Sequence, residues 1–383
     1  MCDPADSSQL KEWLFPPEDL ELCRSRANRV ARKYLDAQRD EQETEDAINN
    51  NTKNGNVPVQ CFARHFIANK VTFLSEDDGP LQTSDGRTFL TPDEECLLVS
   101  FYASKLPSLI GPMAQLPRLR REPKVPATAA MLLRRFYLSN SVMIHDPKTV
   151  MVSAAFLASK VEDAMTDVRY LEEGTNLMNA PVPLSEIIPA EIHLLSGVNF
   201  ELLCFHPYKA VLAITEDLRT YLKSERGRTL VQFSDGSDRL IVGQDLKPMH
   251  DAAQAIVNDV VVSDIPMLYT PGQIGLAALM VANDQQEGKE GVPQIDIIGY
   301  LSQRFETADI NKMSFLLNEI CGKLQELKEG KYGCGNYNLD MQVLKGIHKK
   351  LKRVRLWGAK DKKKKRKKEE GEDGPETKKA KTS

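Results

Sequence analysis

Two ionisable residues, Lys160 and Glu191, stand out as candidates for chemistry in this sequence of 383 residues. Lys160 ends a stretch of small residues, and Glu191 lies in the next stretch of helical periodicity, nine residues before Phe200. An amine and a carboxylate together on a partly desolvated surface can bond to the backbone carbonyls and N–H groups of another protein. The alternative is a solvated pair at two helix ends, which contributes only about 0–1 kcal/mol to stability.

Motifs of catalysis and of metal binding do not accompany this pair. The sequence contains no G-x-G-x-x-G, P-loop, H-E-x-x-H or G-x-S-x-G motif, and nothing in it supports an enzyme acting alone. The seven cysteines are dispersed without a C-x-x-C pair, and the six histidines do not cluster. This pattern predicts reduced thiols, no zinc ribbon, and neither a metal nor a cofactor. The longest uncharged apolar stretches are shorter than the ~18 residues of a membrane span, so no membrane partner is expected.

The net charge of −3 divides into an acidic body and a basic tail. Residues 349–383 contain sixteen Lys/Arg and six Asp/Glu, a net charge of +10. The preceding 348 residues contain thirty-five against forty-eight, a net charge of −13. An acidic body argues against a broad or sequence-specific nucleic-acid surface, because neutralising phosphates needs clustered Lys and Arg.

A run of seven basic residues lies in the tail. Such runs are nuclear import signals or nucleic-acid tethers, and the alternative is a disordered tail that only increases solubility. We expect residues 358–383 to be disordered, the run to direct nuclear import, and the protein to be nuclear. The run consists of Lys362, Lys363, Lys364, Lys365, Arg366, Lys367 and Lys368.

Helices are predicted near both ends of the chain. Residues 10–35 have helical periodicity, and Pro16-Pro17 followed by acidic residues suits a helix start. The next segment, 36–88, is predicted to be a polar, partly disordered insertion. A C-terminal helix is predicted over 339–357, where apolar residues recur at helical spacing. These residues are Leu344, Ile347, Leu351 and Val354.

Between residues 90 and 330 the periodicity is helical throughout. Thr91, followed by proline and two acids, predicts a helix N-cap. Further helices are predicted near 127–138, 148–161 and 185–196, and a fifth from Pro207. The 148–161 helix is rich in small residues, which predicts a central place in a bundle because its neighbours can approach closely. Large apolar side chains are expected in the core, since burying each contributes ~1.5–3 kcal/mol. Those side chains are Phe136, Tyr137, Phe156, Leu157 and Phe200.

The helical pattern is repeated at an offset of 124 residues. Both copies read helix, short loop, proline, and then a helix of small residues, which predicts a duplicated all-helical domain. We place the first repeat at 89–222 and the second at 248–330. The linker insertion at 223–247 between them has the composition of a β-hairpin over 229–242. The identical pairs are Ser139 and Ser263, Pro147 and Pro271, Ala154 and Ala278, and Ala158 and Ala282.

Three stretches of the first repeat resemble the cyclin box in order and spacing. They read R-R-F-Y-L-S-N-S-V-M at 134–143, A-F-L-A-S-K-V-E-D at 155–163 and E-I-H-L-L-S-G-V-N-F at 191–200. Within the cyclin family, Trp13-Leu-Phe15 and L-Y-T-P-x-Q-I at 268–274 are most similar to the cyclin H branch. The resemblance covers roughly 10–35 and 90–330, while both insertions and the lysine-rich tail depart from the family pattern.

The resemblance implies an all-α fold of two five-helix bundles in tandem, with flanking helices, small inserted hairpins and no catalysis of its own. It implies a regulatory subunit that binds the catalytic subunit of a cyclin-dependent kinase. The cyclin turns the kinase's regulatory helix inward, so that a glutamate of that helix pairs with the lysine that holds the ATP phosphates. If the inward and outward positions of this helix are populated 1:99, shifting them to 99:1 requires the cyclin to prefer the inward state by ~5 kcal/mol in binding free energy.

The cyclin H branch further implies a kinase that phosphorylates other cyclin-dependent kinases. Within the general transcription factor TFIIH, the same kinase phosphorylates the repeat tail of RNA polymerase II, and a third assembly subunit is expected. Lys160 and Glu191 match the family's lysine and glutamate that bond to backbone groups of the kinase. The residue 124 positions after Lys160 is Asp284, so only the first bundle is expected to face the kinase.

Two alternatives remain beside the cyclin H interpretation. A cyclin C-like or other transcriptional cyclin belongs to the same class, and Trp13-Leu-Phe15 argues against it. A DNA-binding initiation factor resembling transcription factor IIB has tandem cyclin-like repeats as well. That factor is expected to carry a zinc ribbon and basic repeats, whereas this sequence has no C-x-x-C and an acidic body.

Overall fold

The computed structural model describes residues 7–45, 88–233, 236, 239–289, 291–305, 309–330 and 340–355. The segment 46–87, the lysine run and the tail lie outside the described residues, and what was expected of them stays a prediction. Within the described residues, no helix combines the length and the apolar character needed to cross a membrane.

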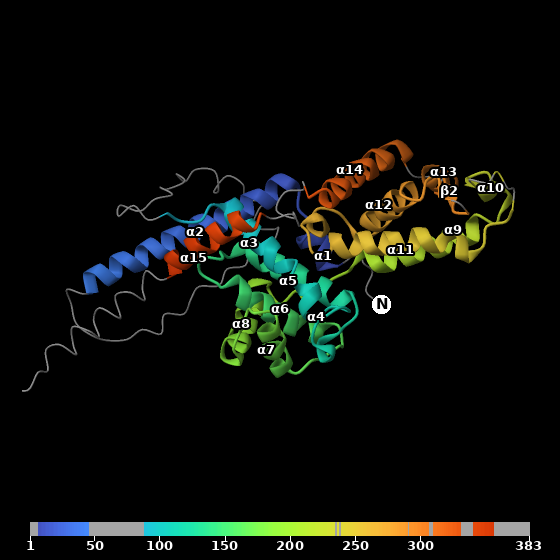
Figure 1. Ribbon diagram of the computed structural model, residues 1–383. Helices are drawn as coiled ribbons and strands as arrows, with labels where there is room; N and C mark the ends of the chain where they lie inside the picture. Colours follow the sequence, from blue (N-terminus) through green and yellow to red (C-terminus); the bar gives the residue numbers. More distant parts are fainter. Residues whose placement is uncertain are drawn as a thin grey trace, which may run out of the picture.

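The described part of the chain is almost entirely helical and forms two bundles (Figure 1). Two N-terminal helices precede the first bundle, α1 (Ser8–Glu12) and α2 (Pro17–Glu45). The first bundle contains α3 (Pro92–Ala103), α4 (Leu106–Ile110), the 3₁₀ turn η4 (Pro117–Leu119), α5 (Lys124–Ser139), α6 (Pro147–Val161), α7 (Val168–Leu177) and α8 (Leu184–Gly197). The second contains α9 (Pro207–Tyr221), α10 (Glu225–Arg228), β1 (Val231–Phe233), α11 (Gly243–Val260), the 3₁₀ turn η5 (Ile265–Met267), α12 (Pro271–Asp284), β2 (Pro293–Ile295), α13 (Ile297–Arg304) and α14 (Ile310–Lys328). The last described helix is α15 (Met341–Arg355).

The central helix of each bundle, α6 or α12, begins at a proline behind a capping residue. Asp146 caps α6 by accepting from the N–H of Lys148, and Thr270 caps α12 by accepting from the N–H of Gln273. Such caps satisfy N–H groups that have no partner inside the helix. Small side chains on α6 and α12 are buried among α5 and α8 in one case and α9, α11 and α14 in the other. The predicted all-α tandem repeat is therefore confirmed.

The first bundle is completed by α7 and not by the helix that starts at Pro207, which belongs to the second bundle. This α9 packs against α11 and α12, which corrects its assignment to the first repeat. Gly275 of α12 explains the close approach, because a Cβ built there would lie 2.9 Å from the Cβ of Ala210 on α9. The second repeat thus includes 207–221, and the insertion at 223–247 lies inside that repeat.

The predicted hairpin over 229–242 is wrong in its pairing. The strand β1 forms, but it pairs antiparallel with β2, so that Val231 lies opposite Ile295. Asn283 of α12 fixes the second strand, since its side chain donates to the carbonyl of Ile295 and accepts from the N–H of Ile295, each at 3.1 Å. Alternating composition indicates a strand, but it does not identify which distant strand will pair with it.

Two further expectations are corrected. The helix α2 continues from residue 36 to Glu45, where a polar insertion was expected. Gln, Glu, Arg and Ala favour helix, so a nucleated helix continues through them at little cost. Cys96 is disulfide-bonded, although the dispersed cysteines predicted reduced thiols, while Cys23, Cys204 and Cys321 are free. Separation in sequence does not exclude contact in the fold.

The N-terminal segment lies where the two bundles meet. Trp13 is fully buried, its Nε1–H donates to Glu201 at 2.5 Å, and the guanidinium of Arg135 lies 4.9 Å from its ring. The side chain of Gln9 bonds to both the N–H and the carbonyl of Phe205 in the α8–α9 linker. The N–H of Phe15 donates to the carbonyl of Met267 in the second bundle at 2.8 Å. This segment therefore joins the linker to both bundles.

A buried charge cluster reinforces the same junction. Asp264, just before η5, forms ion pairs with Arg24 of α2 at 2.8 Å and with Arg134 of α5. Burial by itself raises the pKa of Asp264, but the two guanidinium groups hold that pKa below its usual value. The carboxylate thus connects α2, the first bundle and the second bundle.

Candidate functional site

Lys160 and Glu191 form an ion pair on the surface of the first bundle. Lys160 lies in the last turn of α6 and Glu191 lies in α8, and the Lys160 Nζ contacts the Glu191 Oε1. The lysine side chain is 33% exposed and the glutamate side chain 11%, so the amine reaches solvent and the carboxylate lies beneath it. The ammonium also lies 4.1 Å from the ring centroid of Phe156, which adds a cation–π contact.

Packing between helices fixes the position of Glu191. The hydroxyl of Ser153 on α6 donates to the carbonyl of Ile187 on α8 at 2.7 Å. At the end of α8, a Cβ on Gly197 would lie 2.4 Å from the ring of Phe136 on α5, so α8 approaches α5 too closely for any other residue there. Ser153 and Gly197, the small residues at these two contacts, therefore fix the position of α8 and of its Glu191 carboxylate relative to α6.

A chain of side-chain contacts fixes the end of α6 beside Lys160. Glu162 is the C-cap of that helix, and its carboxylate accepts from the hydroxyl of Thr128 at 2.6 Å and lies 3.5 Å from the Nζ of Lys124. The hydroxyl of Thr128 also contacts the Nε2 of His206 at 2.7 Å. Because the single hydroxyl proton is donated to the carboxylate, His206 donates its Nε2–H to Thr128. Helix α5 and the N-cap of α9 therefore hold the helix end that carries Lys160.

Exposed apolar side chains lie on α8, which carries Glu191, and in the loop that follows α6, which carries Lys160. Ile188 and Ile192 of α8 are 50% and 64% exposed, and Met165 of the α6–α7 loop is 72% exposed. A contiguous exposed apolar patch is typical of a protein–protein interface. These residues were not among the predicted site residues, although α8 has apolar residues on its outer as well as its inner face, a pattern that could have indicated the patch.

Phe200 belongs to this exposed set and not to the core. It is 68% exposed, which makes the prediction of a core residue wrong, whereas Phe136, Tyr137 and Leu157 are buried and Phe156 is half-buried. The cause is local: Asn199 and Phe200 have φ values of 54° and 58°, in the left-handed region, and this conformation ends α8 and turns the ring outward. A bulky residue in this region is strained, and such strain is concentrated at functional sites.

The corresponding position of the second bundle carries the opposite charge. Asp284 is the last residue of α12, and burial together with the Glu287 charge raises its pKa. The structure places an amine at the end of one central helix and a carboxyl group at the end of the other, so the two bundles present different surfaces.

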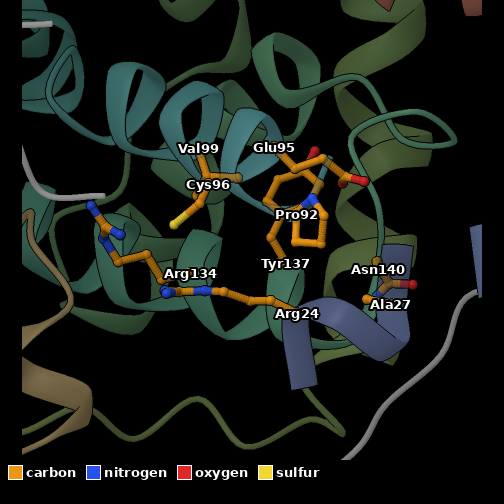
Figure 2. A pocket seen from close by; sticks show the side chains of 9 residues that line it. All are labelled: Arg24, Ala27, Pro92, Glu95, Cys96, Val99, Arg134, Tyr137 and Asn140. Carbon is orange, nitrogen blue, oxygen red and sulfur yellow. The ribbon is translucent and has the colours of Figure 1, made fainter. Parts of the chain in front are cut away.

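Among the described residues, no group of three or more His, Cys, Asp or Glu side chains could hold a metal ion. A cavity of about 20 Å³ lies between α2, α3 and α5 (Figure 2) and is large enough for one water molecule but not for a substrate. It is lined by Arg24, Ala27, Pro92, Glu95, Cys96, Val99, Arg134, Tyr137 and Asn140.

Glu95, which lines this cavity, connects separate elements of the fold through hydrogen bonds. Burial raises the pKa of Glu95 to about 7, while bonds from Asn28, Ser141 and the N–H of Val142 favour its charged form. These donors lie on α2 and in the α5–α6 loop, at 2.6 Å, 2.9 Å and 2.9 Å from the carboxylate. Every contact of this buried carboxyl group therefore joins elements of the fold.

Acidification below pH 6.5 is expected to destabilise the fold through His206. Burial, with the Arg135 charge nearby, lowers the pKa of His206 to about 3. Between pH 3 and the unfolded pKa of about 6.5 the unfolded chain binds a proton that the folded chain does not, so stability falls as pH falls, by about 1.4 kcal/mol per pH unit.

Urea denaturation of the wild type and of His206→Asn from pH 7.5 to 5 measures this dependence. The difference in unfolding free energy between the two proteins reports the contribution of His206, because Glu95 titrates in both. The wild-type advantage should shrink steadily below pH 6.5, and a difference that does not change with pH would contradict the prediction.

Comparisons with known proteins agree with this division of the chain. The family model for the cyclin N-terminal domain matches residues 116–203, and the model for the cyclin C-terminal domain matches residues 206–329. The two matches meet in the α8–α9 linker, where the bundle boundary lies.

Several cyclins are similar to this chain over part or most of their length. Cyclin-H1-1 of Arabidopsis thaliana is 27% identical over 353 residues, which cover 92% of this chain and 88% of that protein. Cyclin CCL1 of Saccharomyces cerevisiae is 31% identical over 195 residues, which cover 51% of this chain but only 43% of that protein. A chain in the structure of the CAK complex of Chaetomium thermophilum bound to ATP-gamma-S matches with a TM-score of 0.62 at 22% identity, covering 98% of this chain and 97% of that one. A likeness at that identity shows the fold.

Proposed function

Because this chain belongs to the cyclin family, we propose that it is a cyclin H-like regulatory subunit that binds and activates a cyclin-dependent kinase. In this role it supports phosphorylation of other cyclin-dependent kinases and, within TFIIH, of the RNA polymerase II tail, together with a third assembly subunit. The observation that carries the proposal is the Lys160–Glu191 ion pair together with the exposed apolar side chains on α8 and just after it, which we call the apolar rim. The similarity to Cyclin-H1-1 across 88% of that protein supports the choice of branch.

The geometry of this surface suits a helix of the kinase. The apolar rim, Ile188, Ile192 and Phe200, supplies area whose burial drives association. On the same surface, the Lys160 amine donates to backbone carbonyls of the kinase and the Glu191 carboxylate accepts from its N–H groups, which are the groups left without partners at helix ends. Docking excludes water from the pair, so these bonds strengthen and specify one orientation of the kinase helix.

Activation then follows from differential binding. A surface that fits the inward position of the kinase helix and not the outward one shifts the population toward the inward state, by as much as the two affinities differ. Phosphate transfer takes place in the kinase, and this chain acts only on the kinase equilibrium. It is therefore a regulatory subunit and not an enzyme by itself.

Reconstitution with a kinase tests the proposal. The purified chain alone should transfer no phosphate from ATP, whereas the chain mixed with the kinase subunit of a CDK-activating kinase should phosphorylate both a cyclin-dependent kinase and a polymerase-tail peptide. Phosphorylation of the tail peptide alone would favour a cyclin C-like role. Absence of any complex with the kinase would refute the proposal.

The lysine run is proposed to direct the chain to the nucleus. Deleting 362–368 should move a fluorescent fusion from the nucleus toward an even distribution, because import receptors bind such clustered basic residues. The matched control removes 369–375, an equal length without lysine. If both deletions leave the fusion nuclear, the run is not the import signal.

A further inference from the structure

The outer face of α15 carries four cationic side chains that the body of the protein does not use. All four are exposed, and they lie at positions i, i+4, i+7 and i+8, which share one face of a helix. We call this set the basic stripe. It consists of Lys345, Lys349, Lys352 and Arg353.

The opposite face of α15 is fixed to the first bundle. Its apolar side chains are buried, and the helix packs against α3. Three polar contacts fasten it: His348 Nε2 with the hydroxyl of Tyr102 at 3.0 Å, Lys350 with Glu94 at 2.7 Å, and Arg355 with Asp146 at 3.2 Å. Two of the six cationic residues of α15 thus attach the helix to the acidic body, and the other four point away from it.

The basic stripe has no partner within the described residues. The helix contains no acidic residue, and none of the four side chains forms an ion pair or hydrogen bond with another described residue. Lys345 and Lys349, and Lys349 and Arg353, are like-charged neighbours at i, i+4, an arrangement that destabilises a helix. The attachment of α15 gains nothing from these charges, so they point to an anionic partner outside the chain.

We propose that the basic stripe binds the phosphodiester backbone of double-stranded nucleic acid without reading its sequence. Residues 345–353 span about 12 Å at the rise of an α-helix. A duplex presents one negative charge per about 1.7 Å of axis, so the stripe lies opposite several phosphates at once. The sequence beyond α15 continues with the lysine run, which extends the same charge. The rest of the chain is acidic and directs the duplex to this one face.

A duplex fits the basic stripe better than the other anionic surfaces do. A membrane-binding helix needs an apolar face to insert between lipids, and the apolar face of α15 is buried against the bundle. Protein interfaces are depleted in lysine and need a desolvated apolar centre. The stripe has lysine at three of its four positions and no apolar centre of its own. Charge neutralisation with counterion release remains as the source of affinity.

The test compares the full chain bound to its kinase with a variant in which all four stripe residues are glutamine. The matched control replaces four exposed lysines of the second bundle by glutamine, which changes the net charge equally. These are Lys209, Lys247, Lys312 and Lys328. The probes are a labelled 20-base-pair DNA duplex in two unrelated sequences and an RNA duplex, with anisotropy followed from 50 to 200 mM salt. Thermal melts and kinase activity establish that both variants are folded.

Of the DNA and RNA duplexes, one will bind the wild type more tightly. The stripe variant is expected to bind that duplex at least tenfold more weakly than the wild type does. The slope of log K against log salt should become shallower by up to about 3.6, since each of the four phosphate contacts contributes about 0.9. The control should bind like the wild type, and the two DNA sequences should bind alike. Equal affinity and slope for wild type and stripe variant would overturn the proposal. Displacement of the duplex by poly-glutamate at the same charge concentration would overturn the assignment to nucleic acid.

Discussion

Replacing Lys160 or Glu191 by alanine is expected to weaken binding of the kinase by roughly 30-fold or more. Removing one partner of a desolvated, hydrogen-bonded charge pair at an interface costs ~2–5 kcal/mol, and 1.4 kcal/mol is a factor of ten. Each substitution leaves backbone groups of the kinase helix and one charge of the pair without partners. Titration calorimetry with the kinase subunit measures the affinity, and phosphorylation of a tail peptide measures activation.

The free subunit should tolerate Glu191→Ala. Lys160 is one-third exposed, so after Glu191→Ala its amine remains hydrated, and loss of the pair should cost under ~1 kcal/mol. Asp284→Ala, at the equivalent position of the second bundle, should leave kinase binding intact. Wild-type binding by both Lys160→Ala and Glu191→Ala would show that the kinase binds elsewhere. A large fall in melting temperature would instead show that the pair is structural.

The tandem repeat could be predicted because close helix packing requires a recognisable pattern of residues within each helix. A helix at the centre of a bundle needs small side chains along its length, and Pro147 and Pro271 mark the starts of two such helices at one offset. The caps that precede them are equally local, since a capping side chain bonds to N–H groups two or three residues away. Features of this kind depend on near neighbours in sequence and are therefore readable from it.

Choices among distant partners could not be predicted. The α9 sequence is compatible with either bundle, and the deciding contact is the absence of a side chain at Gly275, 65 residues after Ala210. The strand at Val231–Phe233 is likewise compatible with a hairpin, but it pairs with β2, which Asn283 holds in place through its hydrogen bond to Ile295. In both cases a residue far along the chain decides between two locally equivalent outcomes.

The candidate site could be predicted in its charges but not in its apolar rim. Lys160 and Glu191 were singled out by their match to the cyclin family pattern, and the structure places them together on adjacent helices. Hydrophobic residues are expected to be buried, so Phe200 was expected in the core. Its exposure arises from two consecutive left-handed residues at the end of α8, a backbone feature without a glycine to reveal it. Exposed apolar residues become informative only when the fold shows which face is free.

Replacing Asp264 by alanine is expected to destabilise the protein by about 3–5 kcal/mol, because removing one partner of a buried ion pair leaves an uncompensated charge. The side chain of Asp264 is 5% exposed, and its partners Arg134 and Arg24 are 2% and 17% exposed. Arg134 also donates to the carbonyl of Val262 at 3.0 Å through Nε, so it cannot leave the site without breaking a second contact with the second bundle. Urea denaturation at pH 7 measures the loss.

The matched control for this junction is Glu216→Ala, which breaks a surface pair. Glu216 lies 2.6 Å from Arg219, with 53% and 45% of the two side chains exposed, so both charges stay hydrated and the cost should be under ~1 kcal/mol. Asp264→Ala should also loosen α2 from the second bundle, since Arg24 loses its carboxylate, and hydrogen exchange in α2 should therefore accelerate in this variant alone. If Asp264→Ala costs no more than Glu216→Ala, the two bundles are held together by Trp13 and its neighbours without the buried carboxylate.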